Sequence, residues 1–169
     1  MKKKDKIRIL FVCLGNICRS PAAEGIMKKL IEENGLEDAV EVDSAGLSDW
    51  HEGELPDSRM RSHGRRRGYD FCSRSRPLER ADFERFDYII VMDSSNYTAA
   101  LSLARTDEDK KKLRRMTDFS SRFSYDHVPD PYYSGASGFE LVLDLLEDAC
   151  GGLLDFICTE ISRNRKGIL

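Results

Sequence analysis

Apolar residues along the chain fall into short continuous runs that alternate with stretches of helical spacing. A short run rich in β-branched residues is typical of a buried strand, and apolar residues three and four positions apart indicate a helix. The runs predict strands over Ile7–Val12, Ala39–Ser44, Asp87–Met92 and, more weakly, Leu113–Phe119. The helical spacing predicts helices over 20–34, Asp57–Arg67, Glu79–Arg85, Ser94–Lys112 and Phe139–Ser162. Alternating strands and helices predict an α/β protein with an open sheet, whose ligands bind at the carboxyl ends of the strands.

Several residues predict where these helices begin and end. Ser20 and Pro21 are typical of an N-cap followed by a first-turn proline. Asp57 is expected to cap the second helix, and Gly68 to end it. In the last helix, Gly151–Gly152 interrupts the pattern at about 1 kcal/mol per glycine relative to alanine. The pair therefore predicts either a kink or a close contact with another element.

Two segments read as loops. Residues 45–56 combine glycine, proline and polar residues with Trp50, and residues 120–137 contain Asp130 followed by Pro131. Loops as long as the second one are uncommon in compact domains, and they are often functional or mobile. Both loops are therefore candidates to surround a binding site.

Length and composition predict one globular domain over residues 1–169, in which the basic residues 1–6 form a mobile tail. Acidic residues outnumber basic ones, 30 to 27, which argues against a nucleic-acid-binding protein. The apolar runs are too short to cross a bilayer, so we expect no membrane association.

The five cysteines are an odd number and do not form the pattern of a secreted disulfide framework. We therefore expect the protein in a reducing cytoplasm. Cys150 and Cys158 fall in the apolar pattern of the last helix, and both are expected to be small buried side chains.

The segment between the first strand and the first helix contains the strongest candidate chemistry. Its backbone N–H groups, at the N-terminus of a helix, would bind an anion and favour the thiolate form of Cys13, the candidate nucleophile. Gly15 and Asn16 tolerate the left-handed backbone that such a loop requires. The candidate phosphate-binding loop consists of Cys13, Leu14, Gly15, Asn16, Ile17, Cys18, Arg19 and Ser20.

Two side chains at the end of this loop suit phosphate chemistry. Arg19 offers a planar fork of donors to two phosphate oxygens, which lysine would not reproduce. The Ser20 hydroxyl can stabilise the Cys13 thiolate or cap the helix, and both roles are compatible. The loop lacks the Gly-Lys-Ser/Thr ending of a Walker loop, and the Cys13 to Cys18 spacing does not indicate a zinc site. The sequence therefore predicts phosphate-ester cleavage by a cysteine, with no metal and no cofactor.

Such a reaction requires an acid that protonates the leaving oxygen. Asp130 is the candidate, because Pro131 stiffens the backbone after it and Tyr132 and Tyr133 can wall a cleft for an aromatic leaving group.

The chain resembles the low-molecular-weight protein tyrosine phosphatases. The resemblance rests on the motif from Val12 to Pro21 and on the Asp-Pro-Tyr-Tyr motif that begins at Asp130. Two further segments, Val42–Gly46 and Phe86–Asp93, are similar to segments of that family.

The resemblance implies a four-stranded parallel sheet flanked by helices, with the phosphate-binding loop after the first strand. It implies a cysteinyl-phosphate on Cys13, with Asp130 acting first as acid and then as base. It also implies that Ser20 and Ser44 hold Asn16, and that Trp50 lines the cleft with the two tyrosines. The implied partners are a phosphotyrosine protein or peptide and a cognate tyrosine kinase.

The chain departs from the resemblance at one position. Many members have histidine in a His-Arg-x-Arg segment that supports the loop, whereas this chain has Ser73 followed by Arg74, Ser75 and Arg76. Since serine can donate only one hydrogen bond there, we expect a weaker support network around Asn16 and Asp93.

Three alternatives remain open. Arsenate reductases of the same architecture also use a cysteine and an arginine at this spacing, and Cys72 is a candidate redox partner. Related protein arginine phosphatases carry threonine at the position of Ile17. A phosphopeptide-binding module would capture the same ligand without turnover.

Overall fold

The computed structural model describes residues 6–166 of the chain. It contains one sheet of four parallel strands in the order β2-β1-β3-β4. The strands are β1 (Ile7–Cys13), β2 (Val40–Gly46), β3 (Tyr88–Val91) and β4 (Leu113–Arg115). The helices are α1 (Arg19–Glu33), α2 (Ser58–Arg66), α3 (Asp82–Arg85), α4 (Ser94–Leu101), α5 (Asp107–Lys112), the 3-10 helix η1 (Met116–Phe119) and α6 (Ala136–Lys166). The predicted four-stranded parallel sheet is confirmed. Of the expected tail at residues 1–6, all but Lys6 lies outside the described residues.

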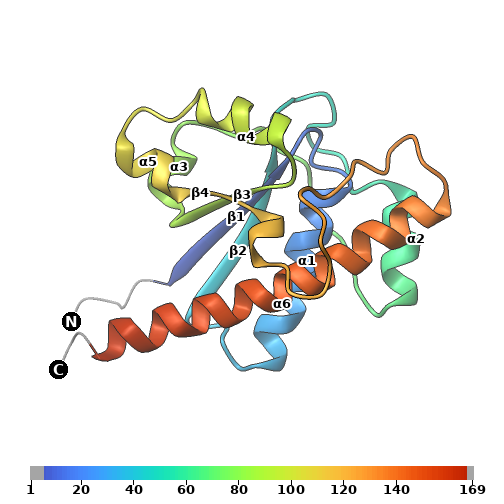
Figure 1. The fold of residues 1–169 in the computed structure, drawn as a ribbon. Coiled ribbons are helices and arrows are strands. Elements are labelled where there is room, and N and C mark those ends of the chain that lie inside the picture. The colour runs from blue at the N-terminus through green and yellow to red at the C-terminus, as the bar shows by residue number, and fades with distance from the viewer. Residues whose placement is uncertain (1–5, 167–169) are drawn as a thin grey trace.

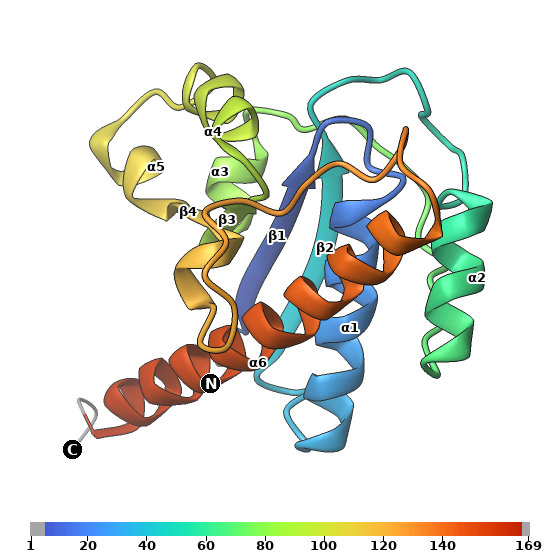
Figure 2. The ribbon, with the colours of Figure 1, turned by 45° about the vertical axis from the view of Figure 1, so that its right-hand side comes forward.

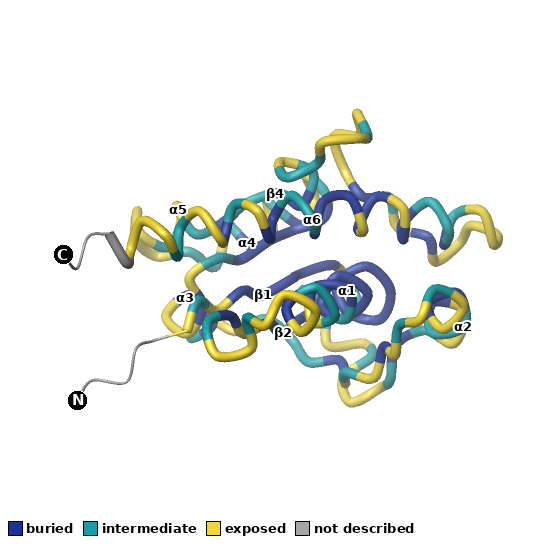
Figure 3. Tube along the Cα trace, turned by 90° about the horizontal axis from the view of Figure 1, so that it is seen from below, coloured by how far each residue is buried: buried dark blue, intermediate teal, exposed yellow. Residues whose placement is uncertain are grey.

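Helices cover both faces of the sheet, with α1 and α6 on one side and α3, α4 and α5 on the other (Figures 1 and 2). The alternation of β1 produces this arrangement, because successive side chains point to opposite faces. Ile9 and Phe11 pack in the core cluster beneath α1 and α6, and Leu10 and Val12 pack in the cluster beneath α3 and α4. Both faces of β1 are therefore buried from Ile9 onward. Figure 3 shows this strand largely in the colour of buried residues.

The strand order places a topological switch beside β1. The chain passes from β1 to β2 at one edge and then returns across β1 to form β3. Open α/β sheets bind ligands at the carboxyl ends of the strands where the order reverses. The loop that follows Cys13 lies at this point.

The predicted cap of the second helix is confirmed. Asp57 accepts a hydrogen bond from the backbone of Arg59 at 2.8 Å, and Gly68 adopts a left-handed φ of 87° after the helix. The predicted N-cap of the first helix is wrong, because α1 begins at Arg19 and its N-cap is Cys18, two residues before Ser20, without a side-chain hydrogen bond. The Ser20 hydroxyl is instead turned toward the loop.

The region 94–119 differs from its prediction in two ways. The expected helix 94–112 is two helices, because Thr106 and Asp109 form a capping box that starts α5 as a separate element. The expected strand 113–119 ends at Arg115, where Asp118 accepts from the Arg115 backbone at 3.2 Å and the chain turns into η1.

The last helix is continuous across Gly151–Gly152, so the predicted kink is absent and the close contact is present. A Cβ added to Gly152 would lie 1.9 Å from the carbonyl oxygen of Phe119. The helix buries Cys150 as expected, but Cys158 is exposed, since it faces away from the core. None of the described helices is both long and apolar enough to cross a membrane.

Candidate active site

The loop from Cys13 to Arg19 surrounds the bottom of a cleft at the carboxyl end of β1. The Cys13 thiol is buried and lies 3.0 Å from the Ser20 hydroxyl oxygen and 3.5 Å from the Ser20 backbone nitrogen. The Ser20 backbone N–H donates to the sulfur, and the Ser20 hydroxyl lies within hydrogen-bond distance of it.

The side chain of Asn16 holds this loop from behind the cleft. Its amide nitrogen donates to the hydroxyls of Ser20 at 2.7 Å and Ser44 at 2.9 Å, and its amide oxygen accepts from the backbone of Arg76 at 3.0 Å. Ser44 in turn donates to Glu24 at 2.6 Å. The three hydrogen bonds of this buried amide group therefore support the loop, and none of them is directed into the cleft.

Two residues that follow Ser73 contact the loop or the groups that support it. The Ser75 hydroxyl donates to the carbonyl of Gly15 at 3.1 Å. Arg76 is itself fixed by an ion pair with the buried Asp82 at 3.1 Å. The segment 73–76 therefore supports the loop through Ser75 and Arg76, and the weaker network expected from Ser73 stays a prediction.

Arg19 is almost completely buried, and it is oriented by groups from distant parts of the chain. Its guanidinium donates to Asp93 at 2.6 Å and to the carbonyl of Val128 at 3.0 Å, and its second terminal nitrogen lies 3.7 Å from Asp130. Burial acts to lower the pKa of Arg19, but Cys13, Asp93 and Asp130 outweigh it, and the pKa is raised. The guanidinium is therefore a permanent cation whose direction is set by Asp93 and Val128.

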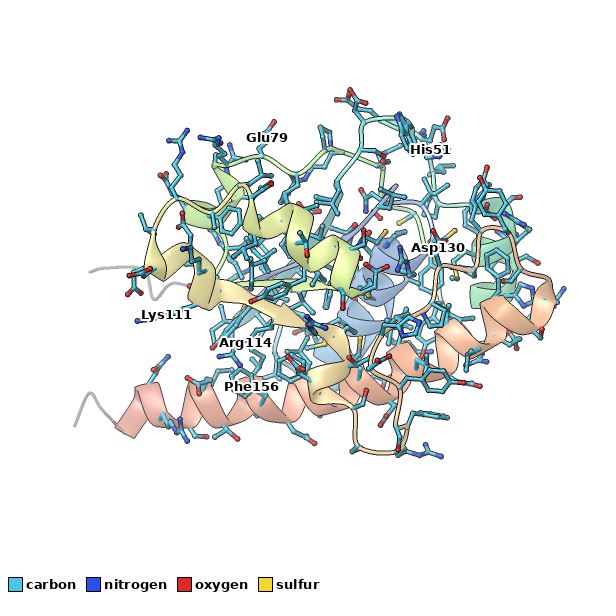
Figure 4. The ribbon with its side chains drawn as sticks, turned by 45° about the horizontal axis from the view of Figure 1, so that its top comes forward. His51, Glu79, Lys111, Arg114, Asp130 and Phe156 are labelled. Atoms are coloured by element: carbon cyan, nitrogen blue, oxygen red, sulfur yellow. The ribbon has the colours of Figure 1, made fainter. Side chains whose placement is uncertain are left out.

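The cleft has a volume of about 160 Å³. Both loops identified in the sequence contribute to it: Figure 4 shows His51 on the loop after β2 and Asp130 on the loop before α6. Its walls are formed by Cys13, Leu14, Gly15, Ile17, Cys18, Arg19, Trp50, His51, Asp130, Tyr132 and Tyr133.

Most of the predicted site residues are brought together here, but they differ in exposure. Trp50 is 73% exposed and Tyr133 is 96% exposed, so these rings lie at the rim of the cleft and not deep within it. Tyr132 packs edge-on against Tyr133, with ring centres 4.9 Å apart. Asn16, Ser20 and Ser44 lie behind the loop and do not line the cleft.

Some details could not be anticipated from the motifs. Only Asn16 in the loop has a left-handed backbone, with φ of 57°, and Gly15 does not. Gly15 is instead crowded by His51, whose ring would lie 3.2 Å from an added Cβ. His51 is a cleft residue that we did not predict. Its position next to Trp50 was the only available signal.

Among the described residues, no group of three or more His, Cys, Asp or Glu side chains has a geometry that could hold a metal ion. Cys18 lies in the cleft wall, where burial, reinforced by Asp57, raises the pKa of its thiol. Because a thiol with a raised pKa stays protonated, Cys18 is a weaker nucleophile than a cysteine in its thiolate form.

The family model for low molecular weight phosphotyrosine protein phosphatases matches residues 8–166. The chain belongs to this family. A low molecular weight protein-tyrosine-phosphatase of Streptomyces coelicolor is 40% identical over 149 residues, which are 87% of this chain and 91% of that protein.

Solved structures agree with this membership. A protein tyrosine phosphatase from Entamoeba histolytica is 46% identical, with a TM-score of 0.86 over 97% of this chain and 100% of that one. A Drosophila arginine phosphatase is 33% identical, with a TM-score of 0.83 over 89% of this chain and 97% of that one. The same fold thus occurs in one protein named as a tyrosine phosphatase and in another named as an arginine phosphatase.

Proposed function

We propose that this phosphatase hydrolyses phosphotyrosine in proteins or peptides through a cysteinyl-phosphate on Cys13. The observation that carries the proposal is the meeting of three groups in one cleft. Cys13 lies at its base, the buried guanidinium of Arg19 is beside it, and the carboxyl group of Asp130 is 3.7 Å from that guanidinium.

In the first step the Cys13 sulfur attacks phosphorus, and an S–P bond forms as the bond from phosphorus to the tyrosine oxygen breaks. Asp130 gives its proton to the departing phenoxide. Arg19 and the loop N–H groups bind the phosphate oxygens that carry the developing charge.

In the second step water attacks the phosphorus of the cysteinyl-phosphate, and Asp130 takes a proton from that water. The S–P bond breaks and releases inorganic phosphate. The thiolate that departs is stabilised by the Ser20 hydroxyl, which lies 3.0 Å from the sulfur.

Turnover of a phosphotyrosine peptide by the Cys13→Ser variant tests the nucleophile. A serine hydroxyl keeps the shape of the loop but not the thiolate, so we expect turnover to be lost while the peptide still binds. Cys18→Ser is the matched control, because it removes the other thiol of the same loop, and we expect it to retain turnover. Full activity in Cys13→Ser contradicts the mechanism.

The similarity to an arginine phosphatase supports phosphoarginine as the second candidate substrate. The apolar side chain of Ile17 in the cleft wall, together with the aromatic rim, favours the flat ring of phosphotyrosine. We expect higher kcat/KM for phosphotyrosine than for phosphoarginine or phosphoserine peptides, and a shift toward phosphoarginine in Ile17→Thr. Comparable rates on phosphotyrosine and phosphoarginine contradict the assignment to phosphotyrosine.

A catalytic thiolate requires a reducing environment, so a cytoplasmic location with a tyrosine kinase as the opposing activity fits this chemistry. Arsenate reduction has less support, since Cys72 is exposed and is not among the residues that line the cleft. Oxidation of thioredoxin that depends on arsenate is the measurement that distinguishes the two reactions.

A further inference from the structure

Arg59, in the first turn of α2, lies outside the set of residues that line the cleft and contacts two aromatic rings beside it. Its guanidinium carbon is 5.3 Å from the centre of the Tyr132 ring and 4.8 Å from the centre of the Phe139 ring. A guanidinium over an aromatic face is attracted to it. Arg59 therefore joins α2 to the loop that carries Asp130 and to the start of α6.

The direction of this guanidinium is fixed by Asp57. Arg59 Nε donates to one carboxylate oxygen of Asp57 at 3.0 Å, and Nη2 donates to the other at 2.9 Å. Burial acts to raise the pKa of Asp57, but the hydrogen bonds from Arg59 outweigh it, and the pKa is lowered. The carboxylate is thus charged at neutral pH, and it orients the Arg59 guanidinium by accepting hydrogen bonds from both Nε and Nη2.

Asp57 is in turn attached to the phosphate-binding loop. Its backbone nitrogen donates to the carbonyl oxygen of Ile17 at 2.8 Å. The pair formed by Asp57 and Arg59 consequently has a fixed position relative to the loop that contains the nucleophile.

Tyr132 connects Arg59 to the acid. The Tyr132 backbone nitrogen donates to the Asp130 carboxylate at 3.0 Å, and Pro131 between them restricts the backbone. The Asp130 side chain is 43% exposed, and its ion pair with Arg19 spans 3.7 Å, so its own contacts constrain it weakly. A fixed Tyr132 ring therefore restricts where the Asp130 carboxyl group can lie.

We propose that Arg59 is a positioning residue for the general acid: through Tyr132 it holds Asp130 at a constant place over the phosphate-binding loop. This inference rests on the proposed role of Asp130 as the acid. It assigns to Arg59 an effect on leaving-group protonation and no contact with the phosphate.

The test compares kcat/KM for aryl phosphates whose leaving phenols have increasing pKa, since poor leaving groups depend most on the acid. In Arg59→Met we expect a loss of about tenfold for phenyl phosphate, because a small displacement of a catalytic group is costly, and about twofold or less for p-nitrophenyl phosphate. Arg59→Lys should be intermediate, since lysine keeps the charge without the planar fork. Arg65→Met, an exposed position on the same helix, is the control and should match the parent protein.

Asp130→Asn, measured in parallel, separates this inference from the one on which it rests. If Asp130→Asn lowers kcat/KM equally for all leaving groups, the acid role itself is wrong. If Asp130→Asn shows the leaving-group dependence but Arg59→Met affects all substrates equally or none, the positioning role of Arg59 is overturned.

The double variant gives a second readout that a merely structural role would not produce. If Arg59 acts through Asp130, adding Arg59→Met to Asp130→Asn should cause no further loss on phenyl phosphate. A further tenfold loss contradicts the inference. Should Arg59→Met fail to fold, the same cycle with Arg59→Lys decides the question.

Discussion

At Asn16 the backbone has φ of 57°, in the left-handed region that non-glycine residues seldom adopt. Asparagine is among the few side chains that tolerate it, and here its amide group also bonds Ser20, Ser44 and the backbone of Arg76. One residue therefore supplies both the backbone conformation of the loop and its attachment to β2 and to the segment before α3.

Two substitutions separate these contributions. Asn16→Gly keeps the left-handed backbone accessible but removes the hydrogen bonds, at a cost of about 1–3 kcal/mol in the free energy of unfolding, since buried partners lose their bonds. Asn16→Ala adds about 1 kcal/mol or more of backbone strain. Chemical denaturation measures both values, and equal stabilities of the two variants would contradict the strain at this position. We also expect a higher KM in each, because the loop loses its shape.

Among the elements, α6 passes close to η1 at Gly152. Gly152 faces the carbonyl of Phe119 at the end of η1, and nothing lies within 4 Å of a Cβ added to the adjacent Gly151. A side chain at position 152 would therefore clash with η1, whereas a side chain at position 151 would have open space. The sequence pattern presents the two glycines as one interruption.

This difference predicts opposite effects of the same substitution. Gly152→Ala should destabilise the protein by about 1–3 kcal/mol, because α6 and η1 must separate. Gly151→Ala should stabilise it by about 0.5–1 kcal/mol, as alanine is the better helix former in an open position. Urea denaturation of both variants gives the comparison. If Gly152→Ala leaves the free energy of unfolding unchanged, η1 moves away from α6 without a cost in stability.

The same helix anchors the start of the loop that carries Asp130. Asp148 accepts hydrogen bonds from the backbone nitrogens of Ser121, Arg122 and Phe123 at 3.1–3.3 Å. Burial acts to raise the pKa of Asp148, but these bonds outweigh it, and the pKa is lowered. A lowered pKa in the folded state means that the carboxylate stabilises the protein above its unfolded pKa of about 3.9 and loses this effect as the pH falls through the folded value.

We therefore expect Asp148→Asn to be less stable than the parent protein at pH 7, and the difference to shrink as the pH falls below about 4. Thermal unfolding of both proteins from pH 7 to pH 3 measures this convergence. A constant difference across that range would mean that the charge of Asp148 is not what holds the loop. Asp155→Asn, an exposed position on the same helix, is the control and should show no such convergence.

At the scale of the whole molecule, the site exists only when distant segments are assembled. Arg19 is oriented by Asp93 after β3 and by Val128 on the loop before α6, and Asn16 is held by β2. A phosphate bound in the loop therefore binds the folded protein and not the unfolded chain. Ligand binding of this kind stabilises the fold.

Inorganic phosphate provides the probe, with the Cys13→Ser variant as the protein. At a concentration 100 times its Kd, phosphate should raise the free energy of unfolding by about 2.7 kcal/mol. The further change Arg19→Ala should remove most of this gain, because the phosphate loses its charged partner. Stabilisation that persists without Arg19 would place the bound phosphate elsewhere.

The strand-loop-helix unit around Cys13, the α/β class and the family resemblance follow from the sequence alone. The reason is that these depend on neighbouring residues: the apolar run of β1, the loop that follows it and helix α1 are continuous in the chain. The position of Asp130 in the cleft could be predicted as well, because Asp130 belongs to a short motif with proline and two tyrosines.

Which groups orient those residues depends on the packing of distant segments. Asp93, Val128 and Glu24 are distant from their partners in sequence, and His51 enters the cleft because β2 lies beside β1. The exposure of Cys158 depends likewise on which face of α6 packs against the core. The division of the predicted helix 94–112 has a local cause, the capping box of Thr106 and Asp109, which apolar periodicity does not register. Periodicity describes one segment at a time, whereas packing between segments sets these contacts and with them the geometry of the site.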